Sequence, residues 1–322
     1  MINITIIGMG LIGASLGMAI REAHEKEAQL GPTVITGYDQ NRRATGEARG
    51  RLAIDREARS LEDALHDAQL VIVAVPVQSI RSVFTQIAPL LPNGAVVTDV
   101  ASTKAQVLEW ARELLPTTVE FIGGHPMAGK ELSGVAAADP DLFKGAIYCL
   151  TPSSRARQSA INLVETMVAQ IHAKVYYIDA AEHDAYVAGV SHLPFMLSTA
   201  LADLVSRSPG WREMAPLAAT GFRDMSRLAS GDAEMHRDIC MTNRVALARW
   251  MEETAQWLLD ARDMIEDAES DQLLDLFTRA RAAREDWLST RPNLRPGEDA
   301  FENISGVTPE RPSLFGRIGK RR

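Results

Sequence analysis

The start of the chain constrains the fold more than any other part of it. A short β-branched run at residues 4–7 is followed at once by Gly8-Met9-Gly10-Leu11-Ile12-Gly13, and residues 14–20 have a helical pattern. A second β-like run, residues 33–38, ends on Asp39. A strand, a glycine turn, a helix and an acid after the next strand form the unit that binds a dinucleotide in a parallel sheet.

The three glycines have separate physical roles. Gly8 permits the tight turn, Gly10 lets a pyrophosphate approach the backbone without meeting a Cβ, and Gly13 lets the helix pack closely on the strand. The N–H groups and positive dipole end of the first helical turn face the phosphates. The pattern therefore predicts cofactor contacts at Gly8, Gly10, Leu11, Ile12 and Gly13.

Asp39 predicts which dinucleotide is bound. Its carboxylate can accept hydrogen bonds from a ribose diol and repels a 2′-phosphate, which favours NAD over NADP. Arg42 and Arg43 stand just behind it and could soften that preference by pairing with a 2′-phosphate.

Composition limits the class of protein. The 322 residues suffice for about two domains, and 46% apolar and 24% charged residues are typical of a soluble globular chain. With 34 basic and 42 acidic side chains, the net charge of −8 argues against a nucleic-acid partner. Apolar runs such as residues 70–75 are too short to span a membrane.

Other features indicate a cytoplasmic protein. The chain begins a strand almost at once, without the basic segment of a signal peptide. Cys149 and Cys240 lie far apart, so we expect both to be reduced. No HxxxH, HExxH or CxxC spacing occurs, and we expect no metal site.

Strand-like and helix-like segments alternate to about residue 178, and only helices follow. This order predicts an α/β fold: a doubly wound, mostly parallel sheet over residues 1–178 and an all-helical domain over residues 179–289. Residues 290–322 hold four prolines and a basic end and are expected to form a flexible tail. The expected strands after residue 40 are 70–75, 95–99, 119–123, 146–150 and 174–178, and the expected helices are 78–91, 104–115, 155–170, 180–205, 211–217, 236–265 and 271–288.

The long C-terminal helices carry apolar stripes. Leu247, Met251, Ala255, Leu258 and Ile265 recur at helical spacing. Such stripes are more than one small helical domain needs, so we expect a homodimer built mainly from residues 180–288.

Three segments meet at one edge of the predicted sheet, because ligands of such sheets bind beyond the carboxyl ends of the strands. They are Val75-Pro76, residues 99–102 and His125-Pro126. His125 follows a buried strand, and the ordinary pKa of a histidine suits proton transfer near neutrality. Surface positions are expected instead for His24, His66, His172 and His183.

Two further patterns allow both a functional and a structural interpretation. His192 lies in Ser191-His192-Leu193-Pro194, where the proline should bend a helix and free carbonyl groups. Arg223 and Arg227 are spaced i, i+4 on one helix face, where they could clamp a carboxylate, although the pattern alone favours a solvated pair.

Five segments together resemble the prephenate/arogenate (cyclohexadienyl) dehydrogenases of tyrosine biosynthesis. The resemblance runs from residue 1 to about residue 288 and implies a Rossmann-type domain, NAD as cofactor, and prephenate or arogenate as substrate. The segments are Gly8–Gly13, DVASTK at 99–104, GGHPMAGKELSG at 123–134, SHLP at 191–194 and GFRDMSR at 221–227.

The resemblance also implies roles for individual residues. It suggests His125 as the base on the ring hydroxyl, with Ser102 supporting that histidine and the nicotinamide. Glu131 would help to close the substrate site, His192 would line it, and Arg227 would bind the ring carboxylate. A base of this kind predicts an acid limb in the pH profile at about pH 6 to 7.

The sequence leaves several alternatives open. An arogenate or dual-specificity enzyme would share all of these motifs, whereas a β-hydroxyacid dehydrogenase or imine reductase should lack the GGHPMAG segment. A non-catalytic regulator would bind NAD without turnover. His236 stands where some relatives carry a tryptophan from the partner subunit, and no C-terminal regulatory domain is evident.

Overall fold

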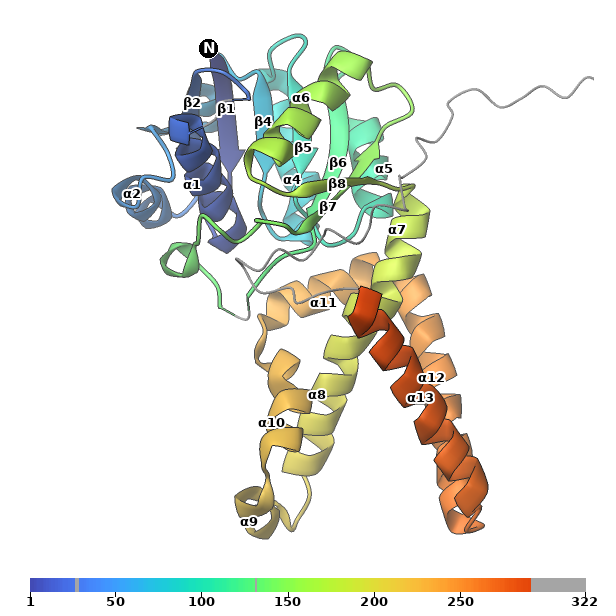
Figure 1. Cartoon of the computed structure of the whole chain (residues 1–322). Coiled ribbons are helices and arrows are strands. Elements are labelled where there is room, and N and C mark those ends of the chain that lie inside the picture. Colours follow the sequence, from blue (N-terminus) through green and yellow to red (C-terminus); the bar gives the residue numbers. More distant parts are fainter. Residues whose placement is uncertain (27–28, 131, 291–322) are drawn as a thin grey trace, which may run out of the picture.

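The computed structural model describes residues 1–26, 29–130 and 132–290. Its first part is an eight-stranded sheet in the order β3-β2-β1-β4-β5-β6-β7-β8, and its second part is helical (Figure 1). Neighbouring strands run parallel except β6 and β7, which pair antiparallel. The strands are β1 (Ile2–Ile7), β2 (Thr33–Tyr38), β3 (Arg56–Glu57), β4 (Leu70–Val73), β5 (Val96–Asp99), β6 (Glu120–Pro126), β7 (Ile147–Pro152) and β8 (Lys174–Tyr177).

Two apolar cores cover the two faces of the sheet, because successive side chains of a strand point to opposite faces. In β4, Ile72 joins the core under α1 and α6, whereas Val71 and Val73 join the core under α3, α4 and α5. Burial on both faces explains why the strand sequences are continuous apolar runs. The helices of this part are α1 (Leu11–Lys26), α2 (Arg42–Gly50), α3 (Leu61–Leu65), α4 (Val77–Ile87), α5 (Ala105–Leu114) and α6 (Gln158–Gln170), with the short turns η1 (Ala88–Leu90) and η2 (Val135–Ala137).

The predicted doubly wound sheet is confirmed, although the short strand β3 was not among the expected strands. A second difference concerns the candidate base. His125 was expected just after a strand, but β6 continues through His125 and Pro126. The reason is the antiparallel partner β7, which pairs Cys149 with His125 and Tyr148 with Pro126. His125 is therefore held by the sheet itself.

The second part begins with an almost continuous helical stretch that leads away from the sheet (Figure 1). It consists of α7 (Ala180–Val187), a π-helical turn η3 (Ala188–His192) and α8 (Leu193–Ser206). The irregular turn lies just before Pro194, which lacks an N–H group, so the predicted disturbance takes the form of a π turn.

By length and composition alone, this Ala180–Ser206 stretch is the one helix among the described residues that could cross a membrane. Its His183, Asp184 and His192 are buried within the fold. We therefore interpret it as a helical stretch of the second part whose start packs against the first part through His183 and Asp184.

The single helix predicted for residues 236–265 is wrong. It is divided at Asn243, which has φ −120° and ψ 33° and separates α11 (Ala233–Thr242) from α12 (Arg244–Glu266). The side chain of Asn243 is buried and hydrogen-bonds to a distant segment, which holds this residue out of the helix. The remaining elements are α9 (Trp211–Met214), η4 (Ala215–Leu217), α10 (Thr220–Ser226), η5 (Arg227–Ser230) and α13 (Ser270–Thr290).

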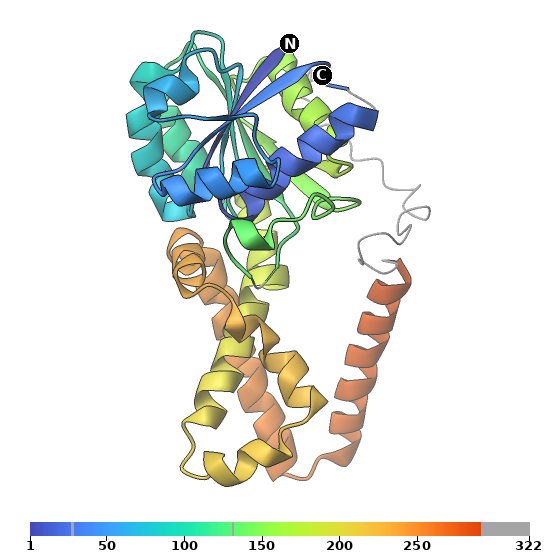
Figure 2. The same ribbon diagram turned by 90° about the vertical axis from the view of Figure 1, so that its left-hand side faces the viewer.

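Helices α12 and α13 leave much apolar surface uncovered. Leu247 is the one buried residue of α12, and α13 has none among the described residues. Figure 2 shows α13 standing apart from the other helices. The large exposed apolar side chains include Trp250, Met251, Trp257, Leu258, Leu259, Ile265, Phe277 and Trp287. Most of the tail predicted from residue 290 onward, residues 291–322, lies outside the described residues.

Candidate active site

The glycine turn joins β1 to α1 beside the carboxyl ends of β2 and β4. Gly8 has φ +100°, and a Cβ there would lie 2.4 Å from the carbonyl oxygen of Ala74. A Cβ on Gly13 would lie 2.0 Å from the carbonyl oxygen of Gly8, whereas a Cβ on Gly10 would meet nothing within 4 Å. The backbone is therefore packed behind the turn and open at Gly10, which fits a phosphate-binding turn.

Asp39 lies against this turn. Its Oδ2 accepts a 2.8 Å hydrogen bond from the backbone N–H of Met9, and its Oδ1 accepts a 2.7 Å bond from that of Asn41. These bonds hold the carboxylate next to the first glycines, where a ribose would follow a pyrophosphate bound at the turn.

The structure places the predicted edge residues along neighbouring strands. Strands β1, β4, β5 and β6 are adjacent in that order. A Cγ atom of Val75 lies 3.0 Å from the position of a Cβ on Gly8, and Pro76 precedes α4. Ser102 is half-buried just after β5, and His125 is near the end of β6. The glycine turn and the candidate base, His125, therefore lie at the same edge of the sheet.

His125 is buried and contacts a second buried histidine. Its Nδ1 lies 2.9 Å from Nε2 of His183, and Nδ1 of His183 lies 2.8 Å from Oδ1 of Asp184. The prediction that His183 lies on the surface is wrong, since its side chain is 1% exposed. Helix α7 turns this side chain toward β6, because His183 shares a helix face with the buried Ala180 and Val187.

Burial lowers the pKa of His125 well below its ordinary value of 6.5, and the neighbouring His183, Lys104 and His192 lower it further. The histidine is therefore neutral and can accept a proton at neutral pH. The acid limb that the sequence predicts at about pH 6 to 7 must lie at lower pH, because His125 resists protonation in this setting.

Lys104 is fully buried, and its charge is one of those that lower the pKa of His125. Its Nζ pairs with Oδ2 of Asp99 and donates a 2.6 Å hydrogen bond to the carbonyl oxygen of Gly124. Oδ1 of Asp99 accepts a 3.1 Å bond from the N–H of Gly124. The ion pair therefore holds the residue preceding His125 at both its N–H and its carbonyl group.

His192 lies at the end of the π turn and is also buried. Its Nδ1 is 3.2 Å from Nδ2 of Asn243, and its Nε2 has no hydrogen-bond partner among the described residues. Burial lowers the pKa of His192 to about 4, so it is neutral at physiological pH. Phe195 lies beside it at a ring-centroid distance of 6.0 Å, and His236 stacks on Phe195 at 4.2 Å.

No three His, Cys, Asp or Glu side chains are grouped as a metal site in the part of the chain that the structure describes.

Comparisons with known proteins identify the family. A family model for the nucleotide-binding domain of prephenate dehydrogenase matches residues 18–177, and one for its dimerization domain matches residues 179–279. The prephenate dehydrogenase of Bacillus subtilis is 30% identical over 321 residues, which are 98% of this chain and 83% of the relative. The chain belongs to the prephenate dehydrogenase family.

Two solved structures of this family have the same fold. The prephenate dehydrogenase of A. aeolicus, in complex with hydroxyphenyl propionate and NAD+, is 27% identical, with a TM-score of 0.81 over 89% of this chain and 98% of that one. Synechocystis arogenate dehydrogenase is 29% identical, with a TM-score of 0.74 over 89% of this chain and 100% of that one. They confirm the Rossmann-type sheet with a helical C-terminal part.

The arginines of the GFRDMSR segment do not share one α-helix, contrary to the sequence prediction. Helix α10 ends at Ser226, whose hydroxyl donates a 2.6 Å hydrogen bond to the carbonyl of Phe222, and Arg227 begins η5. Arg223 pairs with Asp224 at 3.1 Å, and its side chain is 74% exposed. Arg227 is also exposed, on a segment that packs on α8 through a 3.0 Å bond from Ala229 N–H to the Ser198 hydroxyl.

Glu131, the remaining predicted substrate residue, lies outside the described residues. Asp139, a described residue further along the chain, makes two polar contacts. The N–H of Asp139 donates a 2.9 Å bond to the hydroxyl of Ser15, and Lys130 pairs with Asp139 at 2.7 Å.

The sequence motifs assigned no functional role to several buried residues that lie around His125 and His192. They are Asp99, Lys104, Asp184 and Asn243, together with His183. For His183 a signal was available, because it falls in register with apolar residues of its own helix. For Asn243 the sequence offered no signal, because the helical pattern continues on both sides of it and predicts no break.

Proposed function

We propose that this chain is an NAD-dependent prephenate dehydrogenase of tyrosine biosynthesis, acting in the cytoplasm. The observation that supports this most directly is a neutral, buried histidine, His125, on the same sheet edge as the glycine turn. A neutral imidazole can take a hydroxyl proton while a cofactor bound at the turn takes the hydride. NAD in the solved structure of a relative supports the choice of cofactor.

The chemistry needs a base and a means of orientation. When bound, NAD+ supplies the hydride acceptor. The hydroxyl proton of the prephenate ring passes to His125 as hydride leaves the same carbon, and a ring ketone forms. This ketone is conjugated to the carbon that bears the ring carboxylate, so CO₂ can depart with the bonding electrons left in the ring. The oxygen then takes back the proton from His125, and the product is 4-hydroxyphenylpyruvate.

The other residues have binding roles in this proposal. Ser102 supports His125, and His192 and Arg227 bind the substrate, with Arg227 on the ring carboxylate and Arg223 beside it. Glu131 closes the site. The cofactor lies along Gly8, Gly10, Leu11, Ile12, Gly13, Asp39, Val75 and Pro76.

One assay tests this function against its alternatives. The pure protein is incubated with NAD and prephenate, and NADH and 4-hydroxyphenylpyruvate are measured; arogenate is tested in parallel, with tyrosine as the product. Because the two substrates differ only in a pyruvyl or alanyl side chain, the ratio of kcat/KM values decides between them. Binding of NAD without turnover of either substrate would identify a non-catalytic NAD-binding protein.

Asp39 should decide the choice between NAD and NADP. Its carboxylate is fixed beside the turn by two backbone N–H groups and would repel a 2′-phosphate. Replacing Asp39 by serine removes the charge, and the ratio of kcat/KM for NADP to that for NAD should rise about ten-fold or more. A wild-type enzyme that already prefers NADP would contradict the role given to Asp39.

Two glycine substitutions should separate cofactor binding from folding. Gly10→Ala places a methyl group in open space, so the free energy of unfolding without cofactor should change by less than about 1 kcal/mol. NAD binding, measured by calorimetry, should weaken about ten-fold or more, because the methyl group occupies the path of the pyrophosphate. Gly13→Ala drives a methyl group into the Gly8 carbonyl and should destabilise the apo protein by at least about 2 kcal/mol. Equal unfolding curves for the two variants would contradict the binding role given to Gly10 and the packing role given to Gly13.

We also propose that residues 1–178 bind the cofactor and residues 179–289 form a homodimer. The exposed apolar side chains of α12 and α13 support this, as does the match to a family dimerization domain. Light scattering should give about twice the chain mass of 35.2 kDa. Trp257→Asp on α12 should weaken the dimer, whereas Leu52→Asp, on an exposed position of the first part, should not. A wild-type monomer at micromolar concentration would contradict the proposal.

A further inference from the structure

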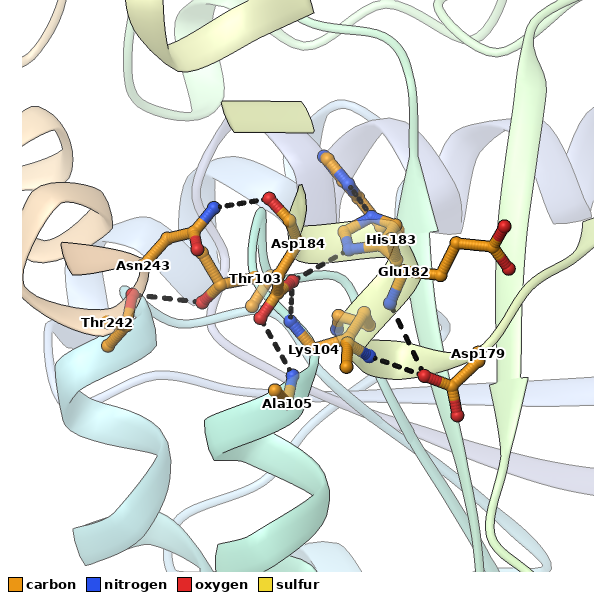
Figure 3. A network of polar contacts seen from close by, with 12 residues as sticks. Thr103, Lys104, Ala105, Asp179, Glu182, His183, Asp184, Thr242 and Asn243 are labelled. Atoms are coloured by element: carbon orange, nitrogen blue, oxygen red, sulfur yellow. Dashed lines mark hydrogen bonds and ion pairs between the residues drawn. The ribbon is translucent and has the colours of Figure 1, made fainter. Parts of the chain in front are cut away.

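Asp184 connects two buried histidines, His183 and His192. Its carboxylate caps the start of α5, where Oδ1 accepts a 2.7 Å bond from the N–H of Lys104 and Oδ2 a 2.9 Å bond from that of Ala105 (Figure 3). Its backbone carbonyl accepts a 2.7 Å bond from Nδ2 of Asn243. The carboxylate faces His183, and Asn243 reaches His192, so one residue influences both rings.

The carboxylate determines where the proton lies on His183. Both oxygens of Asp184 already accept backbone N–H groups, so Nδ1 of His183 must donate to Oδ1 at 2.8 Å. With its proton on Nδ1, His183 presents a bare Nε2, which accepts from Nδ1 of His125 at 2.9 Å. His125 in turn carries its one proton on Nδ1 and a lone pair on Nε2.

The carbonyl of Asp184 has the opposite effect on His192. A carbonyl oxygen can only accept, so it fixes the amide of Asn243 with Nδ2 toward it. The second proton of Nδ2 is left for Nδ1 of His192, 3.2 Å away, which must then be the acceptor. The proton of His192 is therefore on Nε2, the buried atom that has no partner among the described residues.

We propose that Asp184 and Asn243 form a polar hub that sets opposite tautomers in the two histidines, so that His125 presents an acceptor and His192 a donor. His183, Asp184 and Asn243 are positioning residues, since each acts through another side chain. Resting on the proposed function, the acceptor takes the hydroxyl proton of the substrate, and the donor binds a carbonyl or carboxylate oxygen. The other titratable groups around His125 are Lys104, before α5, and Cys149, opposite it on β7.

Nuclear magnetic resonance of the full chain tests the hub without any turnover. Long-range proton–nitrogen spectra of protein labelled with ¹⁵N-histidine distinguish the two tautomers, and single His→Gln variants assign the signals. We expect the proton on Nδ1 in His125 and His183 and on Nε2 in His192, at neutral pH. The Nδ1 tautomers are the more telling result, because free imidazole side chains prefer Nε2. A proton on Nε2 of His125 would overturn the proposal whether or not prephenate is oxidised.

Substitutions at Asn243 and His183 test separately the hydrogen bonds that lead from Asp184 to His192 and to His125. Asn243→Asp replaces the donor by an acceptor, so the proton of His192 should move to Nδ1 while the signals of His125 stay unchanged. His183→Gln retains an acceptor for His125, whereas His183→Leu does not, so kcat for the leucine variant should fall about 10- to 100-fold below that of the glutamine variant. The two variants should have similar KM values. Equal kcat values for Gln and Leu would show that His183 only fills space.

Failure of the hub and failure of the proposed function have different signatures. If neither prephenate nor arogenate is oxidised but the tautomers are as expected, the function is wrong and the hub stands. If turnover is found with His125 protonated on Nε2, the function stands and the hub is wrong.

Discussion

Replacing His125 by asparagine should lower kcat for prephenate about a hundred-fold or more, because the variant keeps a polar group of similar shape but has no base. The wild-type profile should fall on the acid side at a pH below 6.5, since a protonated His125 cannot accept a proton and burial lowers its pKa. This acid limb should be absent from the profile of His125→Asn. The measurement is kcat and kcat/KM over pH 4.5 to 8, approximately the range in which histidines titrate.

Arg227→Ala is the contrasting variant. An arginine on the substrate carboxylate contributes to ground-state binding, so its removal should raise KM more than it lowers kcat. NAD affinity should be unchanged in both variants, because neither side chain belongs to the glycine turn. If His125→Asn kept its acid limb and lost only affinity, His192 would become the first candidate for the base.

Lys104→Met should lower the free energy of unfolding by about 3–5 kcal/mol, which is the usual effect of removing one partner of a buried ion pair. Burial lowers the pKa of Lys104, while Asp99 beside it favours the charged ammonium group. Without the lysine, Asp99 is left buried, and the carbonyl of Gly124 loses its donor. Urea unfolding at one fixed protein concentration measures the loss, since an oligomer's stability depends on concentration.

Lys130→Met is the matched control for this variant. Lys130 also pairs with an aspartate, Asp139, but the two side chains are 37% and 33% exposed. The same substitution there should cost less than about 1 kcal/mol. In the double variant Asp99→Asn/Lys104→Met the buried charge is gone, and part of the lost stability should return. Equal unfolding midpoints for Lys104→Met and Lys130→Met would show that the buried ion pair contributes no more to stability than the exposed one.

The sequence by itself determined the local elements and the ligand edge. The strand, the glycine turn and the helix at the start of the chain are encoded by the apolar periodicity and by the glycines. At Gly8 and Gly13 a Cβ would meet a backbone oxygen, at 2.4 Å and 2.0 Å. Continuous apolar runs indicated the central strands, because both faces of such a strand are buried. Parallel topology then predicts that Val75, Ser102 and His125 lie at one edge of the sheet. The five motif segments between Gly8 and Arg227 were sufficient to indicate the family.

Only the tertiary structure decided what surrounds His125. The register of His183 with buried residues of its own helix indicates burial but not the partner. That partner is β6, and His125 on it lies 58 residues earlier in the sequence. The break at Asn243 depends on a carbonyl 59 residues away, and the cap of α5 depends on a carboxylate 80 residues beyond Lys104. Helical periodicity relates residues three or four positions apart, so it cannot predict hydrogen bonds between distant parts of the chain. The tautomers of two histidines therefore depend on how α7, α11 and α12 pack against the sheet domain.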